Sequence, residues 1–174
     1  MTDEQSRAQF TMWCIMSSPL LISANIGAVG DYALETWGNE EAIYVNQNFR
    51  DFPADTPEEQ MLYQGIRIFG DELKYDKIVD SGSGMNVWAK PLPDGVWAMV
   101  FLNNEDDAKA ITCDGDCFAQ MYDLDTNISY TVRDLWKHQN VAILTADSDG
   151  KFSLTSPDLD PHGGLLMVTI TPQK

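Results

Sequence analysis

FTMWCIMSSPLLISAN, residues 10–25, is the stretch that decides the fold. It lies within a run, residues 8–30, that carries no charged side chain. A membrane-spanning helix needs about 20 predominantly apolar residues, so this uncharged run is long enough to be considered as one. Pro19 and the polar residues around it interrupt the run, and no cluster of Lys or Arg flanks it. The stretch therefore predicts elements packed on a protein core, with no membrane association.

The apolar pattern predicts a helix before Pro19 and a strand after it. Thr2 and Gln5 have the spacing of a capping box, which marks the start of a helix. The apolar residues that follow at helical spacing are Phe10, Trp13, Cys14 and Met16. Residues 20–23 form a short apolar run without alternation, which is typical of a strand buried on both faces of a parallel sheet.

A second helical pattern follows, with Asp31 as its predicted cap and Gly38-Asn39 at its end. The apolar residues of this pattern and of the next helical turn are Ala33, Leu34, Trp37, Ile43 and Val45. Helix, strand and helix together make one unit of an α/β layer. Because a single parallel strand cannot form a sheet, its neighbouring strands must lie outside this chain or in another copy of it.

Composition excludes several classes of function. The chain has 174 residues and a formal net charge of -16, and its pI is near 4.1. Nucleic-acid and anionic-membrane binding depend on clustered Lys and Arg, which are absent here. The sequence contains no Gly-x-Ser-x-Gly elbow, P-loop or dinucleotide fingerprint, so it predicts no cofactor. His138 and His162 are isolated in the sequence, and no metal site is predicted from them.

Cys113 and Cys117 enclose three small polar residues, Asp-Gly-Asp. They could form a disulfide or supply two ligands of a zinc site. Zinc would need two further ligands at recognisable spacing, so the pattern favours the disulfide and an oxidising compartment. Asn127-Ile128-Ser129 is a glycosylation sequon, which agrees with a secreted, lysosomal or vacuolar location. Cys14, within an apolar helical pattern, is predicted to be a buried small hydrophobe.

The sequence predicts three regions, residues 1–48, 49–83 and 84–174. The second region is an acidic connector in which Pro57 can begin a short helix, and residues 81–84, SGSG, mark its end. After it the apolar period changes to two, which predicts an antiparallel sandwich. Residues 96–102 are apolar on both faces, so we expect a central strand there, after a turn at Asp94-Gly95. The predicted strands are residues 86–92, 96–102, 108–112, 119–124, 129–134, 141–145, 151–155 and 165–171.

Several motifs, in order along nearly the whole chain, resemble one known family. They are QSR (5–7) with Phe10 and Trp13, SPLLIS (18–23), NEEAIYVNQ (39–47), VWAKPL (87–92), Cys113 to Cys117 with Phe118, YTVRDLW (130–136) with His138, and PHG (161–163). Together they resemble the C-terminal portion of the α-galactosidases of glycoside hydrolase family 27. The chain departs from the family at Asn48, where the family usually has Asp, and in its longer acidic connector.

The resemblance implies an α/β barrel remnant, the last helix-strand-helix unit of a (β/α)8 barrel, followed by an all-β antiparallel sandwich. It implies retaining hydrolysis of terminal α-linked galactose, with α-N-acetylgalactosaminidase as the alternative within the family. Both catalytic Asp residues of the family lie upstream of this chain, so the chain alone is predicted to be inactive. Its partner would be the missing N-terminal barrel segment, which would bind the galactoside. Ser23 and Asn25 would be structural residues at the barrel rim, and family members vary in forming homo-oligomers.

An alternative function is a stand-alone carbohydrate-binding or interaction module. Trp88 and Trp136 could stack on sugar rings or lie in the core, whereas Trp13, Trp37 and Trp97 fit core positions. We find no local substitute for the two carboxyl groups of a retaining hydrolase. The candidate pairs are Asp123 with Asp125, Asp147 with Asp149 and Asp158 with Asp160, and all three fall where turns are predicted.

Overall fold

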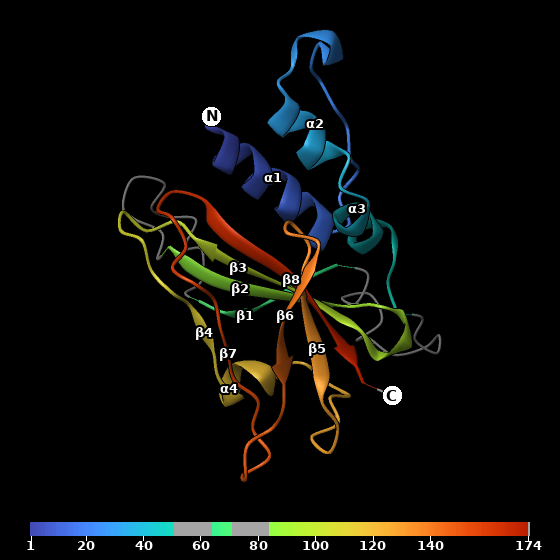
Figure 1. The fold of residues 1–174 in the computed structure, drawn as a ribbon, viewed down its shortest axis with the longest axis vertical. Coiled ribbons are helices and arrows are strands. Elements are labelled where there is room, and N and C mark those ends of the chain that lie inside the picture. The colour runs from blue at the N-terminus through green and yellow to red at the C-terminus, as the bar shows by residue number, and fades with distance from the viewer. Residues whose placement is uncertain (51–63, 71–83, 174) are drawn as a thin grey trace.

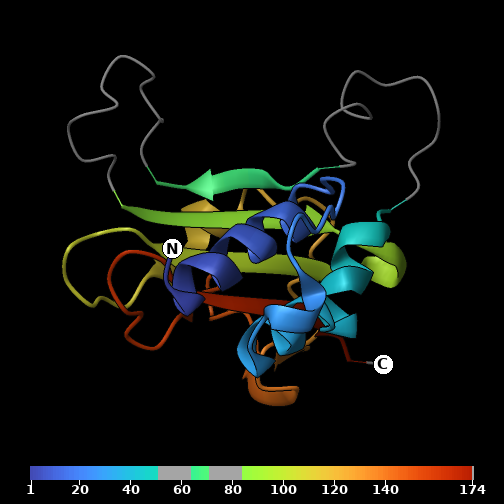
Figure 2. The same ribbon diagram turned by 90° about the horizontal axis from the view of Figure 1, so that it is seen from above.

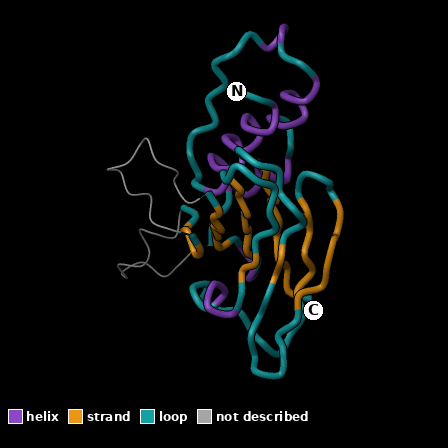
Figure 3. Tube along the Cα trace, turned by 90° about the vertical axis from the view of Figure 1, so that its left-hand side faces the viewer, coloured by secondary structure: helices purple, strands orange, loops and turns teal. Residues whose placement is uncertain are grey.

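The computed structural model describes residues 1–50, 64–70 and 84–173. Helices α1 (Asp3–Ile15), α2 (Asp31–Trp37) and α3 (Glu40–Gln47) lie on one face of a six-stranded antiparallel sheet (Figure 1). The view from above shows α1 crossing this face with α2 and α3 beside it (Figure 2). A second, smaller layer covers the other face, and Figure 3 shows the sheet between the two.

Helix α1 begins as predicted. The Thr2 hydroxyl accepts a hydrogen bond from the Gln5 backbone N–H at 3.2 Å, and the Gln5 side chain accepts one from the Thr2 N–H at 3.0 Å, which completes the capping box. The prediction for α2 is wrong by one residue, because Gly30 occupies the N-cap position and Asp31 is the first helical residue. Asp31 still suits this position, since acidic side chains interact favourably with the helix N-terminus.

The strand predicted at residues 20–23 is not formed. No regular strand occurs between α1 and α2, and residues 26–28 form a single 3-10 turn, η1 (Ile26–Ala28). Leu21 and Ile22 are 76% and 47% exposed. The physical reason is the one given by the sequence: a parallel strand needs neighbours, and the part of the chain that the structure describes offers none beside it.

The large sheet has the order β1-β2-β3-β8-β5-β6, and all of its pairings are antiparallel. Its strands are β1 (Ile66–Phe69), β2 (Met85–Pro91), β3 (Trp97–Asn103), β5 (Tyr130–Asp134), β6 (Gln139–Leu144) and β8 (Gly164–Pro172). Every residue of β3 is buried, which confirms the predicted central strand. The turn before β3 contains Asp94 and Gly95, both with positive φ, within the 3-10 turn η3 (Pro93–Gly95).

The sheet separates two hydrophobic cores. The sandwich core includes Trp97, Phe101, Tyr130 and Phe152. The helix-side core joins Phe10, Cys14 and Ile15 of α1 and Val45 of α3 to Leu92, Val100 and Met167 of the sheet side. Side chains alternate across β3, with Trp97, Met99 and Phe101 in one core and Ala98, Val100 and Leu102 in the other. The helices and the sandwich therefore share one packed body.

The second layer of the sandwich is small. It contains the two-stranded sheet β4 (Thr112–Cys113) with β7 (Leu154–Thr155) and the short helix α4 (Gly115–Phe118). The predicted strands at 108–112 and 151–155 shorten to these pairs and to a single bridge between Lys109 and Leu159. The predicted strand at 119–124 is wrong: these residues follow α4 as turns, because Asp114 caps that helix by accepting from the Cys117 N–H at 3.1 Å.

The connector prediction is corrected at one place. Residues 66–69 form β1, which pairs with β2 and extends the large sheet. The helix predicted at Pro57 and the boundary residues 81–83 lie outside the described residues. The sheet therefore begins before residue 84.

Candidate functional site

The most exposed apolar part of the N-terminal region is residues 20–29, here called the rim segment. Leu21, Ile22 and Ile26 are 76%, 47% and 61% exposed. Ser23 and Asn25, the predicted rim residues, are also exposed, and the Asn25 carboxamide oxygen accepts from the Gly27 N–H at 3.2 Å. An apolar segment of this kind on a very acidic protein is suited to binding another polypeptide surface.

The turn that leads from α1 into the rim segment is held by hydrogen bonds from α3 and from residue 65. The Asn46 carboxamide donates to the Trp13 carbonyl at 3.1 Å and to the Ser18 carbonyl at 2.9 Å. The Gly65 N–H donates to the Ile15 carbonyl at 2.8 Å. The Trp13 and Ile15 carbonyls are at the end of α1, where carbonyls have no partner within the helix, and the Ser18 carbonyl lies in the turn that follows.

Lys90 reaches the same turn from the sheet. It lies in β2, and its side chain is fully buried between the sheet and the helices. Its Nζ donates to the Ser17 hydroxyl at 2.6 Å, to the Val45 carbonyl at 2.5 Å and to the Asn46 carbonyl at 3.4 Å. Burial lowers the pKa of the Lys90 ammonium from 10.5 to about 8. Burial also raises the pKa of the neighbouring Cys14 thiol to about 12, so that thiol stays protonated.

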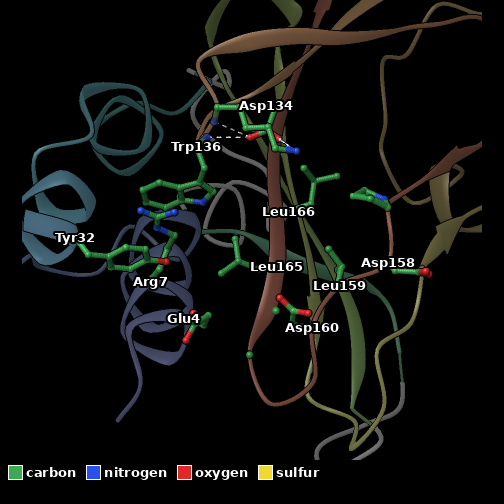
Figure 4. Close-up of a pocket in the computed structure, with 14 residues that line it drawn as sticks. Glu4, Arg7, Tyr32, Asp134, Trp136, Asp158, Leu159, Asp160, Leu165 and Leu166 are labelled. Carbon is green, nitrogen blue, oxygen red and sulfur yellow. Dashed lines mark hydrogen bonds and ion pairs between the residues drawn. The ribbon is translucent and has the colours of Figure 1, made fainter.

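Arg7 joins α1, α2 and the sheet at a second point. Its guanidinium lies over the ring of Tyr32 at 4.0 Å and over the ring of Trp136 at 4.7 Å, between the two aromatic faces in Figure 4. Its nitrogens also donate to the Thr36 hydroxyl at 3.2 Å and to the Glu35 carboxylate at 3.0 Å. The Arg7 guanidinium thus makes two ring contacts and two hydrogen bonds, and it connects α1 to α2 and to the turn that follows β5.

A third connection joins α3 to the end of β5. The Glu41 carboxylate accepts two hydrogen bonds from Arg133, at 2.7 and 3.0 Å, and contacts His138 Nδ1 at 2.6 Å. The hydrogen bond from Arg133, followed by that from His138, lowers the pKa of Glu41. The Asn39 carboxamide donates to the Leu135 carbonyl at 2.9 Å while its oxygen caps α3 through the Ala42 N–H. These contacts fix α3 relative to the sandwich.

A cavity of about 290 Å³ lies between α1, α2 and the sheet. Figure 4 shows Glu4 on its helix side, and Asp158 and Asp160 on the other side beside Leu159. The backbone and Thr2 hydrogen bonds of Glu4 lower its pKa, which disfavours a proton-donor role. Asp134, also in the lining, has one carboxylate oxygen bonded to the N–H groups of Trp136 and Lys137. We assign none of these carboxyl groups to hydrolysis.

The other acidic pairs belong to turns. Asp125 accepts from the Asn127 N–H at 2.8 Å, and Asp147 accepts from the N–H groups of Asp149 and Lys151 at 2.9 Å. Asp123 has positive φ and forms an exposed ion pair with Arg50 at 3.4 Å. These geometries support the turn interpretation of the sequence.

A metal site and a membrane-spanning helix are both absent from residues 1–50, 64–70 and 84–173. No group of His, Cys, Asp or Glu side chains is arranged to hold a metal ion. None of the helices there combines the length and apolar character of a membrane span.

Cys113 and Cys117 form a disulfide with a Cα–Cα distance of 5.2 Å. It joins β4 to α4, and both cysteines lie in the sandwich core. Asn127 is exposed, and its carboxamide donates to Asp125 at 2.8 Å. Its glycosylation stays a prediction.

Trp88 and Trp136, the predicted sugar-stacking residues, are each half-buried and pack against the helix-side core. One face of Trp136 is covered by Arg7. Among the core predictions, Trp97 is fully buried, while Trp13 and Trp37 are partly buried against the helix-side core. The structure does not bring Trp88 and Trp136 into contact with Ser23 or Asn25 in any described interaction.

The region where α1–α3 meet the sheet and the turn after α1 is here called the junction. The sequence did not predict that Lys90, Arg7 and Asn46 would form contacts there. Lys90 carried a usable signal, because it is the only charged residue in the strand sequence MNVWAKP. A charge on a buried strand needs partners from another element. Arg7 and Asn46 carried no such signal, since polar residues on helices are ordinary.

Known proteins share the sequence pattern and the architecture of this chain. The sequence profile described as "Alpha galactosidase C-terminal beta sandwich domain" matches residues 82–168. Alpha-galactosidase 3 of Arabidopsis thaliana is 29% identical over 173 residues, which is 99% of this chain and 33% of that protein.

Two solved structures have the same fold. The α-galactosidase I of Mortierella vinacea superposes with a TM-score of 0.72 at 21% identity, covering 98% of this chain and 36% of that one. A protein described as a putative α-N-acetylgalactosaminidase from Bacillus halodurans gives 0.71 at 15% identity, covering 99% and 33%.

The chain spans about a third of the length of the curated relatives it matches. The part it matches includes both the helices and the sandwich, because the alignments cover 98% or more of this chain. The chain thus belongs to the glycoside hydrolase family 27 α-galactosidases, as the C-terminal portion in which the end of the barrel is joined to the C-terminal β-sandwich domain.

Proposed function

We propose that this chain is the C-terminal part of a retaining α-galactosidase that hydrolyses terminal α-linked galactose. It supplies the last helix-strand-helix unit of the (β/α)8 barrel and the β domain, and an upstream segment supplies both catalytic Asp residues and binds the galactoside. The observation that carries the proposal is the rim segment: Leu21 and Ile22 lie in water although α1 and α3 on either side of it are packed on the sheet.

The chemistry supports this division of roles. A retaining glycosidase needs two carboxyl groups about 5 to 5.5 Å apart, one as nucleophile and one as acid and base. The carboxyl pairs considered in this chain form turns or line the junction cavity. The rim segment would become the last barrel strand, and Ser23 and Asn25 would then lie at its carboxyl end, where barrel active sites are built.

We further propose the domain division 1–48, 49–83 and 84–174, with β1 as the part of the connector that joins the sandwich. The Cys113–Cys117 disulfide supports an oxidising compartment, secreted or lysosomal and vacuolar. Exposed Asn127 would be the glycosylation site.

A complementation assay tests the function. The 174-residue chain alone should not hydrolyse p-nitrophenyl α-galactoside above the uncatalysed rate. The same chain mixed with a family 27 barrel segment that ends before the last helix-strand-helix unit should do so. Hydrolysis by this chain alone would refute the division of roles, and an inactive mixture in which the two parts bind would refute the α-galactosidase assignment.

The sugar has one alternative within the family. The Bacillus halodurans structure described as a putative α-N-acetylgalactosaminidase has the same fold, so the fold of the C-terminal part does not distinguish the two sugars. The discriminating residues would lie in the upstream segment. The same mixture assayed with p-nitrophenyl α-N-acetylgalactosaminide decides between the two sugars.

A further inference from the structure

We propose that Lys90 is a positioning residue through which the β domain sets the direction of the last barrel strand. The inference rests on the proposed function for the meaning of that strand, but its geometry is entirely within this chain. Lys90 belongs to β2 of the sheet, and the atoms it contacts belong to the ends of α1 and α3. It is therefore a direct link between the sandwich and the turn that leads into the rim segment.

The acceptors around Lys90 explain why an ammonium is buried there. The Val45 and Asn46 carbonyls lie in the last turn of α3, where carbonyl groups lack partners within the helix. A positive charge at a helix C-terminus also interacts favourably with the helix dipole. The three N–H bonds of the Lys90 ammonium match three oxygen atoms, at 2.6 Å for Ser17, 2.5 Å for Val45 and 3.4 Å for Asn46.

The contact with Ser17 carries the positioning role. Ser17 has a φ of 51°, the left-handed conformation that turns the chain away from the axis of α1. Its N–H bonds the Cys14 carbonyl at 3.2 Å, and the Ser18 N–H bonds the Trp13 carbonyl at 2.9 Å. Pro19 follows directly and restricts the backbone of Ser18. The backbone conformation of this turn is thus restricted, and the Lys90 ammonium bonds the turn from the side of the sheet.

The same turn is held on its other side by Asn46, which donates to the Trp13 and Ser18 carbonyls. The Lys90 ammonium donates to hydroxyl and carbonyl oxygens, and within the described residues no carboxylate pairs with it. Removing the ammonium would take this donor away from the buried Val45 carbonyl and from the partly buried Ser17 hydroxyl. The consequence would be a turn free to open, with the sheet unchanged.

Hydrogen exchange on the 174-residue chain tests this directly. In Lys90→Met the Ser17 and Ser18 amides should exchange about tenfold faster, while the β3 amides keep their wild-type rates. Lys90→Arg, which keeps a charged donor, should restore slow exchange. Lys109→Met is the matched control, because that side chain is 43% exposed and its ammonium forms a surface ion pair with Glu105.

Ser17→Ala removes the other end of the link and decides the question if Lys90→Met does not fold. It should also speed exchange at Ser18 without affecting β3. Unchanged exchange at Ser18 in Ser17→Ala, or an equal increase at β3 in Lys90→Met, would overturn the proposal.

The complementation mixture adds an activity readout. Lys90→Met should lower kcat for p-nitrophenyl α-galactoside, and Lys90→Arg should rescue it. If the wild-type mixture is inactive, the proposed function fails, and the exchange experiment still decides whether Lys90 holds the turn.

Discussion

At the scale of single residues, the junction depends on buried polar groups that find their partners on a different element. Lys90 and Asn39, both buried, bond backbone carbonyls across the junction between the helices and the sandwich, and the partly buried Asn46 bonds the Ser18 carbonyl in the turn after α1. Such groups cost free energy when buried alone and stabilise the fold only in one arrangement. They make the relative placement of helices and sheet specific in a way that apolar packing alone would not.

Lys90 gives the junction a defined pH dependence. Its pKa is about 8 in the folded chain and 10.5 as the ordinary value, so between these the unfolded chain binds more protons and stability rises with pH. Cys14 opposes this above pH 9.0, its ordinary pKa, because its folded pKa is about 12 and the unfolded thiol then loses its proton first. We expect the free energy of unfolding to rise by about 1 kcal/mol between pH 7.5 and 9.

Urea titrations at several pH values measure this rise. Lys90→Met should remove it, and Lys109→Met should leave it intact. A wild-type chain whose stability is flat from pH 7.5 to 9 would contradict the expectation.

The Glu41 network should stabilise the fold more than a surface ion pair. Glu41→Gln is expected to cost about 1 kcal/mol, because its carboxylate is 28% exposed and bidentate to Arg133. The matched control is Glu35→Gln, whose carboxylate is 60% exposed beside Arg7 and should cost nearly nothing.

Since the pKa of Glu41 is lowered on folding from 4.5, its contribution should be present above that pH and fade as the pH falls through the folded value. Thermal unfolding of both variants at pH 7 and pH 3 measures this. Equal costs for the two variants at pH 7 would show that the network adds nothing.

At the scale of elements, the sequence predicted those whose signal is local. The capping box fixed the start of α1, and the unbroken apolar run of 96–102 predicted the central strand β3. The sequence-based predictions failed for segments whose secondary structure depends on partners that are distant in the chain. Residues 66–69 became a strand only because β2 offers an edge to pair with, and residues 119–124 lost their strand because Asp114 starts a helix just before them.

Residues 20–23 are the instructive failure. Their composition is that of a buried strand, yet Leu21 and Ile22 are exposed. Local sequence encodes a strand, but only neighbouring strands can form it. The junction residues were unpredictable for a related reason, since nothing in the spacing of Arg7 indicates that Tyr32 and Trp136 will enclose its guanidinium.

Charged substitutions in the rim segment should hardly change the stability of the isolated chain but should abolish activity in the complementation mixture. The double variant Leu21→Asp, Ile22→Asp should leave the unfolding free energy of this chain within about 0.5 kcal/mol of wild type, because both side chains are exposed. The same variant should abolish complementation with the upstream barrel segment. Val100→Asp, at a fully buried position, is the destabilising control.

Chemical denaturation and the galactoside assay read the two effects separately. A large loss of stability in the isolated double variant would show that the rim segment is packed within this chain. Full activity of the variant mixture would show that the barrel does not use it.

At the scale of the whole molecule, the helical unit and the sandwich share one packed core in spite of their different origins in the fold. Phe10, Cys14 and Val45 pack in one core with Val100 and Met167. The sequence predicted the class change near residue 84 and a central strand that is apolar on both faces, but it could not show that α1–α3 would cover one of these faces. That cover depends on long-range packing, which periodicity does not report.

Truncation tests this unity. A chain of residues 84–174 alone exposes Leu92, Val100 and Met167 and removes β1, one of the two strands that pair with β2. We expect it to bind the dye ANS and to self-associate, because exposed apolar surface and open sheet edges favour both. Size-exclusion chromatography beside the 174-residue chain measures the difference, and a monomeric truncated chain without ANS binding would contradict the shared core.

The exposed rim segment also bears on how such a protein is made. In the proposed arrangement the neighbouring strands leave the ribosome first, so Leu21 and Ile22 would dock as soon as they emerge, while the sandwich is still being synthesised. A copy translated without those strands would keep these side chains in water. It would be recognised by chaperones as an incomplete client, however well its own sandwich had folded.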